Sequence, residues 1–485
     1  MRKMKGIGSF RRASFGLGSL AAWTIGGLVA AALALAMASP EASPQARAAG
    51  PAVLLISIDG LHPDNVLEAD RHGLKIPTLR RLLKDGAHAT AMRGVLPTVT
   101  YPSHTTMLTG VWPVKHGIPT NVPFDPLNRN QGVWYWYAED IKTPTLWDAA
   151  TAAGYVVGSV SWPVSVAAPG IAWNIPEYWR AMKSPEEIKL VRAISTPGLF
   201  RDLEPSAGRY TNDLDEAIPG DEARTRYAVA MIRQKQVRFL TIHMAGFDHV
   251  EHDAGPYSRE AFTVLEAIDG MVAEMEAAMR AADPRAIVCI VSDHGFAATT
   301  KETHLNAALV EAGLIRLTPP RAAAAQTIAE WDAAAWNSGG STAIMLKNPG
   351  DRAVTAKVEQ LLRTLAADPA NGIAAILDPA TIAEMGGAPG PAFVVDFRPG
   401  YAAGGALTGP VVRERKTAGG AHGYAPTHPE LLASFFIAGP GIAPGKNLGE
   451  IDMRAIAPTL ARIMGVPLPT ADLKPLDVAP APPAR

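Results

Sequence analysis

The chain has 485 residues, of which 48% are hydrophobic and 19% charged, a composition typical of a folded protein and unlike that of a disordered one. Its 45 basic and 46 acidic residues give a net charge of −1, and no basic stripe is present, which argues against a duplex nucleic-acid binder. The single cysteine, Cys289, cannot form an internal disulfide, so the fold does not depend on a disulfide framework.

The first 48 residues have the order of an export signal. Basic residues precede an apolar run from about Phe15 to Ala38, and small residues follow up to an A-x-A site that ends at Ala48. The pair Arg11-Arg12 ahead of Phe15 resembles a twin-arginine signal, which directs the export of folded proteins. We therefore expect a signal peptide at 1–48, a catalytic domain at 49–485, and a periplasmic or secreted product.

The same apolar run is long enough to span a bilayer, so an uncleaved anchor is the alternative, and it would be the chain's one contact with a membrane. Cleavage would remove six basic residues and one acidic residue, which leaves 39 basic and 45 acidic residues and a net charge of −6. A mature protein of this charge again argues against binding to duplex nucleic acid.

Short apolar runs predict strands, and amphipathic segments between them predict helices. The predicted strands are 53–58, 156–161, 239–243, 287–292 and 432–437, and the predicted helices are 77–83, 145–153, 221–234, 259–280 and 305–313. Because strands alternate with helices, we expect an α/β/α sandwich with a largely parallel central sheet. The segment from about 296 to 420 is less regular, and we interpret it as an inserted cap.

Acids and imidazoles gather where these strands end, and ligands bind at the carboxyl ends of parallel strands. The residues concerned are Asp59, Asp248, His252, Asp293, His294 and His422. Each one alone also fits a turn or a solvated loop. Together they predict a metal site, because Asp and neutral His suit zinc, and two such ions can stabilise the attacking and leaving oxygens of an in-line displacement.

Thr100 is the candidate nucleophile. It precedes a predicted helix that opens near Pro102, where free backbone N–H groups and the helix dipole favour an anion. Taken alone, a threonine at this place fits a helix cap. Beside metal ligands, which activate a weak hydroxyl nucleophile, we interpret it as catalytic.

Five motifs in this order and spacing resemble the nucleotide pyrophosphatase/phosphodiesterase family of the alkaline phosphatase superfamily. They are Thr100-Tyr-Pro-Ser-His104, Leu108–Ile118 followed by Asn121, the set Asp248, His252, Gly255 and Pro256, Asp293-His294-Gly295, and His422-Gly423-Tyr424. The resemblance runs from about residue 52 to 465. It implies an alkaline phosphatase-like fold.

The resemblance also implies the cofactors and the roles of residues. One Zn²⁺ would be held by Asp248, His252 and His422, and a second Zn²⁺ by Asp59, Asp293 and His294 with Thr100. Other divalent metals also bind Asp/His sites. Thr100 would form a phospho-enzyme intermediate, and Asn121 would donate a hydrogen bond to a phosphoryl oxygen. Two departures are Ser103, where the family commonly has Asn, and His62, where it often has a basic residue.

The remaining histidines near these motifs are interpreted as structural, because surface and core histidines are common. They are His62, His243, His249, His304 and His428.

The substrate predicted from the sequence is a small-molecule phosphodiester or nucleotide. The stretch Ser159–Val164, which contains Trp162, resembles a diesterase segment and has no cation to clamp a dianionic monoester. Tyr101, beside the nucleophile, offers an aromatic face to a base or aryl leaving group, although core packing explains it equally well. Nucleotides, cyclic diesters and lysophospholipids all stay open as substrates.

Three alternatives were considered. A phosphomonoesterase of the same superfamily shares every ligand and differs only in substrate preference. A sulfatase needs a modified Cys or Ser in a C/S-x-P-x-R setting, and none surrounds Thr100. A non-catalytic metal-binding surface module would lack the nucleophile or a ligand, and neither is missing here.

Overall fold

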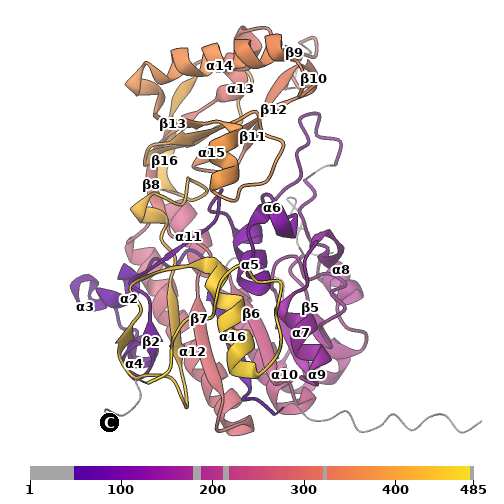
Figure 1. Cartoon of the computed structure of the whole chain (residues 1–485), viewed down its shortest axis with the longest axis vertical. Helices are drawn as coiled ribbons and strands as arrows, with labels where there is room; N and C mark the ends of the chain where they lie inside the picture. The colour runs from indigo at the N-terminus through magenta and orange to yellow at the C-terminus, as the bar shows by residue number, and fades with distance from the viewer. Residues whose placement is uncertain (1–48, 131, 179–186, 211–217, 321–324, 481–485) are drawn as a thin grey trace, which may run out of the picture. The chain divides into compact units, whose positions relative to one another are not determined.

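The computed structural model describes residues 49–130, 132–178, 187–210, 218–320 and 325–480 (Figure 1). The signal predicted for 1–48 lies outside the described residues. Within the described ranges, no helix is both long and apolar enough to cross a membrane.

The central sheet has eight strands in the order β18-β2-β17-β7-β1-β6-β4-β5. Their bounds are β1 Val53–Ile58, β2 Ala87–His88, β4 Val157–Val160, β5 Trp173–Ile175, β6 Phe239–Met244, β7 Ile287–Val291, β17 Phe435–Ala438 and β18 Lys446–Asn447. The five strands from β7 to β5 are mutually parallel, and β17 is antiparallel to both β7 and β2. The expected largely parallel sheet is confirmed.

Both faces of this sheet are buried, which explains why its strands are continuous apolar runs. All six residues of β1 are buried; Leu54 and Ile56 face one hydrophobic core, and Val53 and Leu55 face the other. The first core is covered by α4 (Pro77–Asp85), α10 (Ile218–Lys235) and α12 (Arg259–Ala282). The second is covered by α5 (Thr100–Thr109), α7 (Leu146–Ala152) and α16 (Ile456–Met464). The layers therefore form the expected α/β/α sandwich (Figure 1).

Shorter elements connect these layers. They are α2 (Asp64–Leu67), α3 (Ala69–His72), β3 (Ala91–Arg93), α6 (Pro113–His116), α8 (Glu187–Ile194), α9 (Leu199–Ala207), α11 (Gly246–Ala254) and β19 (Glu450–Asp452).

The segment between β7 and His422 contains more regular structure than its sequence pattern indicates. Its elements are β8 (Ala297–Thr303), α13 (Leu305–Glu311), β9 (Ile315–Leu317), β10 (Ile328–Trp331), β11 (Ala333–Asn337), β12 (Ser341–Leu346), α14 (Arg352–Ala366), β13 (Ile373–Leu377), α15 (Pro379–Glu384), β14 (Phe393–Phe397), β15 (Gly400–Ala403) and β16 (Val412–Ala421). These form an antiparallel sheet in the order β11-β12-β14-β13 and a second sheet in the order β15-β8-β16. A separate hydrophobic cluster, including Ile344, Val358 and Phe397, holds them together.

Candidate active site

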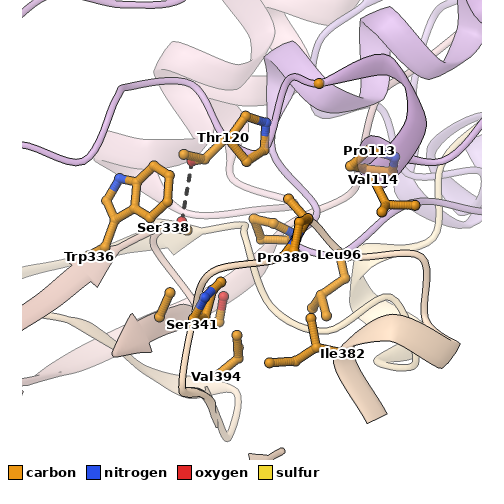
Figure 2. A pocket seen from close by; sticks show the side chains of 17 residues that line it. Leu96, Pro113, Val114, Thr120, Trp336, Ser338, Ser341, Ile382, Pro389 and Val394 are labelled. Carbon is orange, nitrogen blue, oxygen red and sulfur yellow. Dashed lines mark hydrogen bonds between the residues drawn. The ribbon is translucent and has the colours of Figure 1, made fainter. Parts of the chain in front are cut away.

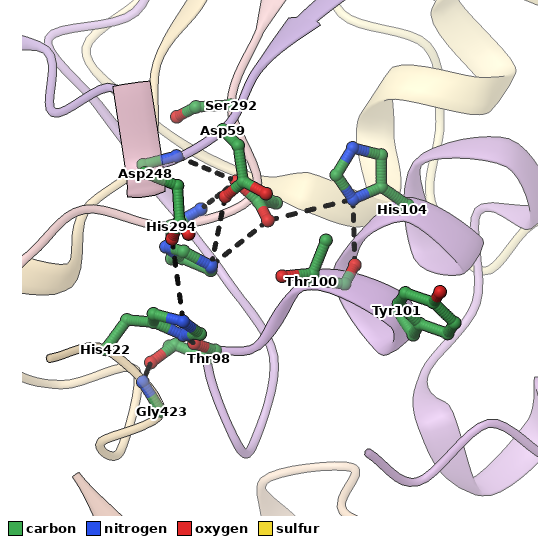
Figure 3. Close-up of polar contacts among 12 residues, drawn as sticks. Asp59, Thr98, Thr100, Tyr101, His104, Asp248, Ser292, His294, His422 and Gly423 are labelled. Atoms are coloured by element: carbon green, nitrogen blue, oxygen red, sulfur yellow. Dashed lines mark hydrogen bonds and ion pairs between the residues drawn. The ribbon is translucent and has the colours of Figure 1, made fainter. Parts of the chain in front are cut away.

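The carboxyl ends of β1, β6 and β7 deliver polar side chains to one edge of the central sheet. Asp59 directly follows β1, and Asp293 and His294 follow β7 after one serine. After β6 the chain enters α11, which carries Asp248 and His252 four residues apart and hence on one helical face. His422 directly follows β16 and completes the set (Figure 3).

Two compact groups of possible metal ligands share His294. In the first group, Nε2 of His294 lies 3.1 Å from Oδ2 of Asp293 and 3.4 Å from Oδ1 of Asp59. In the second group, Nε2 of His422 lies 3.6 Å from Oδ1 of Asp248. The rings of His294 and His422 stack with their centroids 3.7 Å apart, so the two groups are directly adjacent.

His252 lies at the outer side of the second group. Its Nε2 is 3.5 Å from Oδ2 of Asp248, its Nδ1 is 3.3 Å from the carbonyl oxygen of Gly420, and its side chain is 40% exposed. All six ligands named from the sequence therefore lie within one region, with His252 outside the two compact groups and His294 common to both.

The side chains of these groups fit a metal ion. Two ligand atoms that are each about 2.0–2.1 Å from a tetrahedral zinc ion lie about 3.3 Å apart, and the ligand separations here are 3.1–3.6 Å. Oδ1 of Asp59, Oδ2 of Asp293 and Nε2 of His294 are buried and form no hydrogen bond. Buried polar atoms are rarely left in that state, and a cation would supply the missing partner.

The pKa values of the metal-free side chains show the same need for a cation. Burial, together with the carboxylates of Asp248 and Asp293, raises the pKa of Asp59 well above its usual value. Burial lowers the pKa of His422, and the neighbouring His294 and His252 lower it further. Burial also opposes ionisation of His294, but the carboxylates of Asp293, Asp59 and Asp248 together outweigh it and raise the pKa of His294 to about 9. Crowded like charges of this kind are relieved when a divalent ion is bound.

A second layer of polar side chains holds Asp59 in place. Nε2 of His243 lies 2.9 Å from Oδ2 of Asp59, and Nδ1 of the same ring lies 2.7 Å from Oε2 of Glu177. Burial opposes ionisation of Glu177, but His243 and Tyr101 favour it, and the pKa of Glu177 is lowered. The sequence alone indicates an ordinary structural role for His243; the signal for its support of Asp59 is its position in the largely apolar strand β6, one residue before the strand ends.

The start of α11 is held by a buried acid from another helix. Asp221, on α10, accepts hydrogen bonds from the backbone N–H groups of Ala245 and Gly246, at 3.2 and 3.0 Å. Its carboxylate also pairs with the buried guanidinium of Arg224 at 2.6 Å. Because α11 carries Asp248 and His252, this anchor positions two of the candidate ligands. Asp221 lies 24 and 25 positions before Ala245 and Gly246 in the sequence, so no local sequence pattern predicts this anchor.

Thr100 is the first residue of α5 and is buried, with 7% of its surface exposed. Its carbonyl oxygen lies 2.8 Å from Nδ1 of His104, which also approaches Oδ2 of Asp293 at 3.7 Å. The backbone N–H of Tyr101 donates to Oδ1 of Asn121 at 2.8 Å. A backbone N–H can only donate, so the Asn121 oxygen must face it, and the amide NH₂ is left to donate elsewhere at this helix N-terminus.

Tyr101 and Trp162, the substrate contacts predicted from the sequence, are both fully buried in the structure. Their contact with substrate stays a prediction. Tyr101 packs edge-on against Trp134, and Trp162 packs edge-on against His104. Ser103, the departure from the family's usual Asn, is also completely buried. Their motif positions are explained by packing under the N-terminus of α5.

The other histidines interpreted as structural have partners away from the metal ligands. Nε2 of His62 lies 3.0 Å from the carbonyl oxygen of Pro429, and Nε2 of His428 lies 2.6 Å from Oδ2 of Asp396. His304 accepts from the backbone of Ala406, and His249 approaches Asp253 at 3.9 Å near the surface.

A largely parallel α/β sandwich with carboxylates and imidazoles gathered at its strand ends is the arrangement of a metal-dependent hydrolase. The comparison with family models identifies one family. Residues 53–425 match the type I phosphodiesterase/nucleotide pyrophosphatase model, and the chain belongs to this family. The model is named for phosphodiesterases and nucleotide pyrophosphatases, and it is the family that the motifs predicted.

Curated relatives are similar over part of their length. Human ectonucleotide pyrophosphatase/phosphodiesterase family member 1 is 25% identical over 258 residues, which are 50% of this chain and 23% of that protein. Human family member 5 is 34% identical over 119 residues, 23% of each chain. The matched region is thus about a quarter of the length of these relatives.

Solved structures show the same fold. Murine ectonucleotide pyrophosphatase/phosphodiesterase 5 superposes with a TM-score of 0.60 at 17% identity, covering 86% of this chain and 96% of that chain. An inactive threonine-to-alanine form of that murine protein, in complex with AMP, superposes with a TM-score of 0.58 at 16% identity and the same coverage.

Proposed function

We propose that the protein is an exported two-metal phosphodiesterase or nucleotide pyrophosphatase that works through a phosphothreonine intermediate on Thr100. The observation that carries the proposal is the position of Thr100 at the N-terminus of α5, in contact through His104 with the Asp59, Asp293 and His294 group. Family membership supports the reaction class, and the site chemistry supports these roles.

Asp59, Asp293 and His294 would hold one Zn²⁺, and Asp248, His252 and His422 the other. Two bound zinc ions supply Lewis acidity, which neutralises charge on the phosphoryl group and lowers the pKa of the attacking hydroxyl. In the first step Thr100 attacks phosphorus through Oγ1, the P–O bond to the leaving alcohol or nucleotide breaks, and the leaving oxygen takes a proton. Water then hydrolyses the phosphothreonine and restores the hydroxyl.

The N-terminus of α5 is suited to the transferring group. The Tyr101 N–H donates to Oδ1 of Asn121, the Ser103 N–H donates to the Val99 carbonyl oxygen, and Pro102 has no N–H, so the attraction for an anion comes from the helix dipole and from the Asn121 amide NH₂. Both contribute most where negative charge grows on the phosphoryl oxygens in the transition state.

Small phosphodiesters and nucleotides are the proposed substrates. The murine relative has been solved in complex with AMP, and the curated relatives carry the name ectonucleotide pyrophosphatase/phosphodiesterase. We further propose that residues 1–48 act as an export signal, that 49–485 form the catalytic domain, and that about 296–420 form its cap. The cleaved product would be periplasmic or secreted.

The decisive experiment compares wild type with Thr100→Ala and Thr100→Ser on bis-p-nitrophenyl phosphate and on p-nitrophenyl phosphate. We expect turnover of the diester to exceed that of the monoester, Thr100→Ala to lose diester turnover while it keeps its metal, and Thr100→Ser to keep part of the activity. Full activity in Thr100→Ala would overturn the nucleophile. A strong monoester preference in wild type would instead establish the phosphomonoesterase.

A further inference from the structure

A cavity of about 340 Å³ lies where the segments 96–97 and 113–120 of the core meet the segments 336–343 and 382–394 of the proposed cap (Figure 2). Its 17 lining residues include no charged side chain. Small-molecule sites are usually mostly apolar cavities of about 300–1,000 Å³ with a few placed polar groups. The size and lining of this cavity match that description.

The walls of the cavity are preformed and poor in hydrogen-bond donors. Five of the lining residues are prolines, namely Pro97, Pro113, Pro119, Pro389 and Pro391, and proline has a fixed φ and no backbone N–H. Leu96, Ile382 and Val394 are buried in the floor, whereas Val114 is 47% exposed. An exposed apolar side chain on the lining favours entry of an apolar group.

The polar side-chain groups that line the cavity are three hydroxyls and the indole N–H of Trp336, which donates to the Val122 carbonyl oxygen at 3.1 Å. Oγ1 of Thr120 lies 3.3 Å from Oγ of Ser338, and this pair spans the gap between the core and cap segments (Figure 2). The hydroxyl of Ser341 donates to the carbonyl oxygen of Gly423 at 2.5 Å and is therefore occupied. Among the lining side chains, a ligand could contact one free hydroxyl pair but no charged group. Binding of an ionic group is therefore disfavoured, because its charge would be buried without a counter-charge.

The cavity adjoins the candidate active site along three segments of chain. Thr120 precedes Asn121, and Pro97 precedes Thr98, whose carbonyl oxygen lies 3.1 Å from Nδ1 of His422. The Ser338 carbonyl packs so closely on Gly423 that a Cβ at that glycine would come within 1.5 Å of the carbonyl oxygen. The backbone N–H of Gly340 donates to the carbonyl oxygen of His422 at 2.6 Å. A group bound in this cavity therefore lies against the segments that carry Asn121, Thr98 and His422.

We propose that the cavity receives an uncharged, apolar ester group of the substrate, such as an alkyl chain. The inference rests on the proposed phosphodiesterase function and names the class of diester that the site would prefer. The phosphate would bind at the metals and at Asn121, while the apolar ester arm would displace water from the cavity beside Thr120 and Trp336.

The test uses two diesters with the same leaving group and charge, methyl p-nitrophenyl phosphate and hexyl p-nitrophenyl phosphate. In wild type we expect kcat/KM for the hexyl ester to be at least about tenfold higher, because the additional methylenes leave water. Ala343→Leu, which fills the cavity from β12, should lower this ratio about fivefold or more. Ala374→Leu, on an exposed position of β13 outside the cavity, is the matched control and should leave the ratio unchanged.

A variant with the opposite effect keeps the test decisive if Ala343→Leu fails to fold. Ile382→Ala enlarges the cavity floor and should raise the ratio of kcat/KM for the octyl ester over the hexyl ester. Hydrolysis of both esters with no hexyl preference in wild type, or an unchanged octyl ratio in Ile382→Ala, overturns the apolar site alone. Failure of wild type to hydrolyse even the methyl ester overturns the proposed function itself.

Discussion

Nε2 of His243 lies 2.9 Å from Oδ2 of Asp59, and the opposite ring nitrogen lies 2.7 Å from Glu177. A carboxylate accepts hydrogen bonds, so Nε2–H of the imidazole donates to Asp59 and fixes its rotation. Oδ2 is occupied by this bond, which leaves Oδ1, an atom without a hydrogen bond, to face His294. His243 thus selects which oxygen of Asp59 is available to a metal ion.

Replacing His243 should weaken metal binding without removing a ligand. We expect His243→Leu to lower zinc affinity about 10–100-fold, the usual cost of losing a residue that orients a ligand. His243→Gln, whose amide can still donate to Asp59, should recover most of it. Zinc titration of the purified apo-protein measures both, with His72→Leu at the end of α3 as the control. Equal affinities in His243→Leu and wild type would sink the positioning role.

The crowding of Asp59 with Asp248 and Asp293 predicts opposite effects on the apo and metal-loaded protein. Asp59→Asn removes one carboxyl group from this crowded set, so the apo-protein should melt a few degrees, roughly 2–4 °C, higher than apo wild type. Chelation should lower the Tm of wild type, because a bound ion stabilises the folded state alone. The chelator effect should be smaller in Asp59→Asn. Thermal scans with and without EDTA measure both effects. An apo Tm of Asp59→Asn below that of apo wild type would contradict the prediction.

The central sheet was predictable because its strands are buried on both faces. In β1, Ser57 is the single polar residue among five apolar ones, and runs of this kind are typical of parallel sheets. The ligands were predictable for a related reason, since Asp59, Asp293 and His294 directly follow those strands. The local sequence therefore predicts both the strand and the metal-ligand residue that follows its end.

The network around the ligands was not predictable in the same way. His243 meets Glu177, 66 residues away, and Asp221 meets the start of α11, 24 residues away, so each pairing depends on how strands and helices pack. The burial of Tyr101 and Trp162 likewise follows from tertiary packing against Trp134 and His104. Sequence motifs marked those positions as important but did not distinguish contact with substrate from support of the helix.

Asp283 makes stability depend on pH at the edge of β1. Burial alone raises its pKa, but hydrogen bonds from Arg285, Arg238 and the Ala52 backbone outweigh burial and lower the pKa of Asp283 to about 2. Its stabilisation is therefore present above the unfolded-state value of about 3.9 and is lost as pH falls through about 2.

Asp283→Asn should consequently lower the free energy of unfolding at pH 7 by about 1–2 kcal/mol, less than the full shift implies because the site is partly solvated. The difference from wild type should narrow between about pH 4 and pH 2. Urea unfolding at several pH values measures it. Asp477→Asn, which loses a surface pair with Lys446, is the control and should leave the free energy of unfolding close to that of wild type. A difference in the free energy of unfolding between Asp283→Asn and wild type that stays constant down to pH 2 would show that the Asp283 carboxylate is not its cause.

The oxygen and the NH₂ group of the Asn121 amide have different roles. Substitutions at Asn121 can therefore separate structural support from charge stabilisation. Its Oδ1 accepts from the Tyr101 backbone, and only its NH₂ can donate to a phosphoryl oxygen. Asn121→Asp keeps the acceptor but replaces the donor with negative charge, whereas Asn121→Ala loses both. We expect both variants to lower kcat on bis-p-nitrophenyl phosphate about 100-fold or more, with zinc content unchanged. Only Asn121→Ala should also lower the Tm. Near-normal turnover in Asn121→Asp would show that the amide does not act on phosphate.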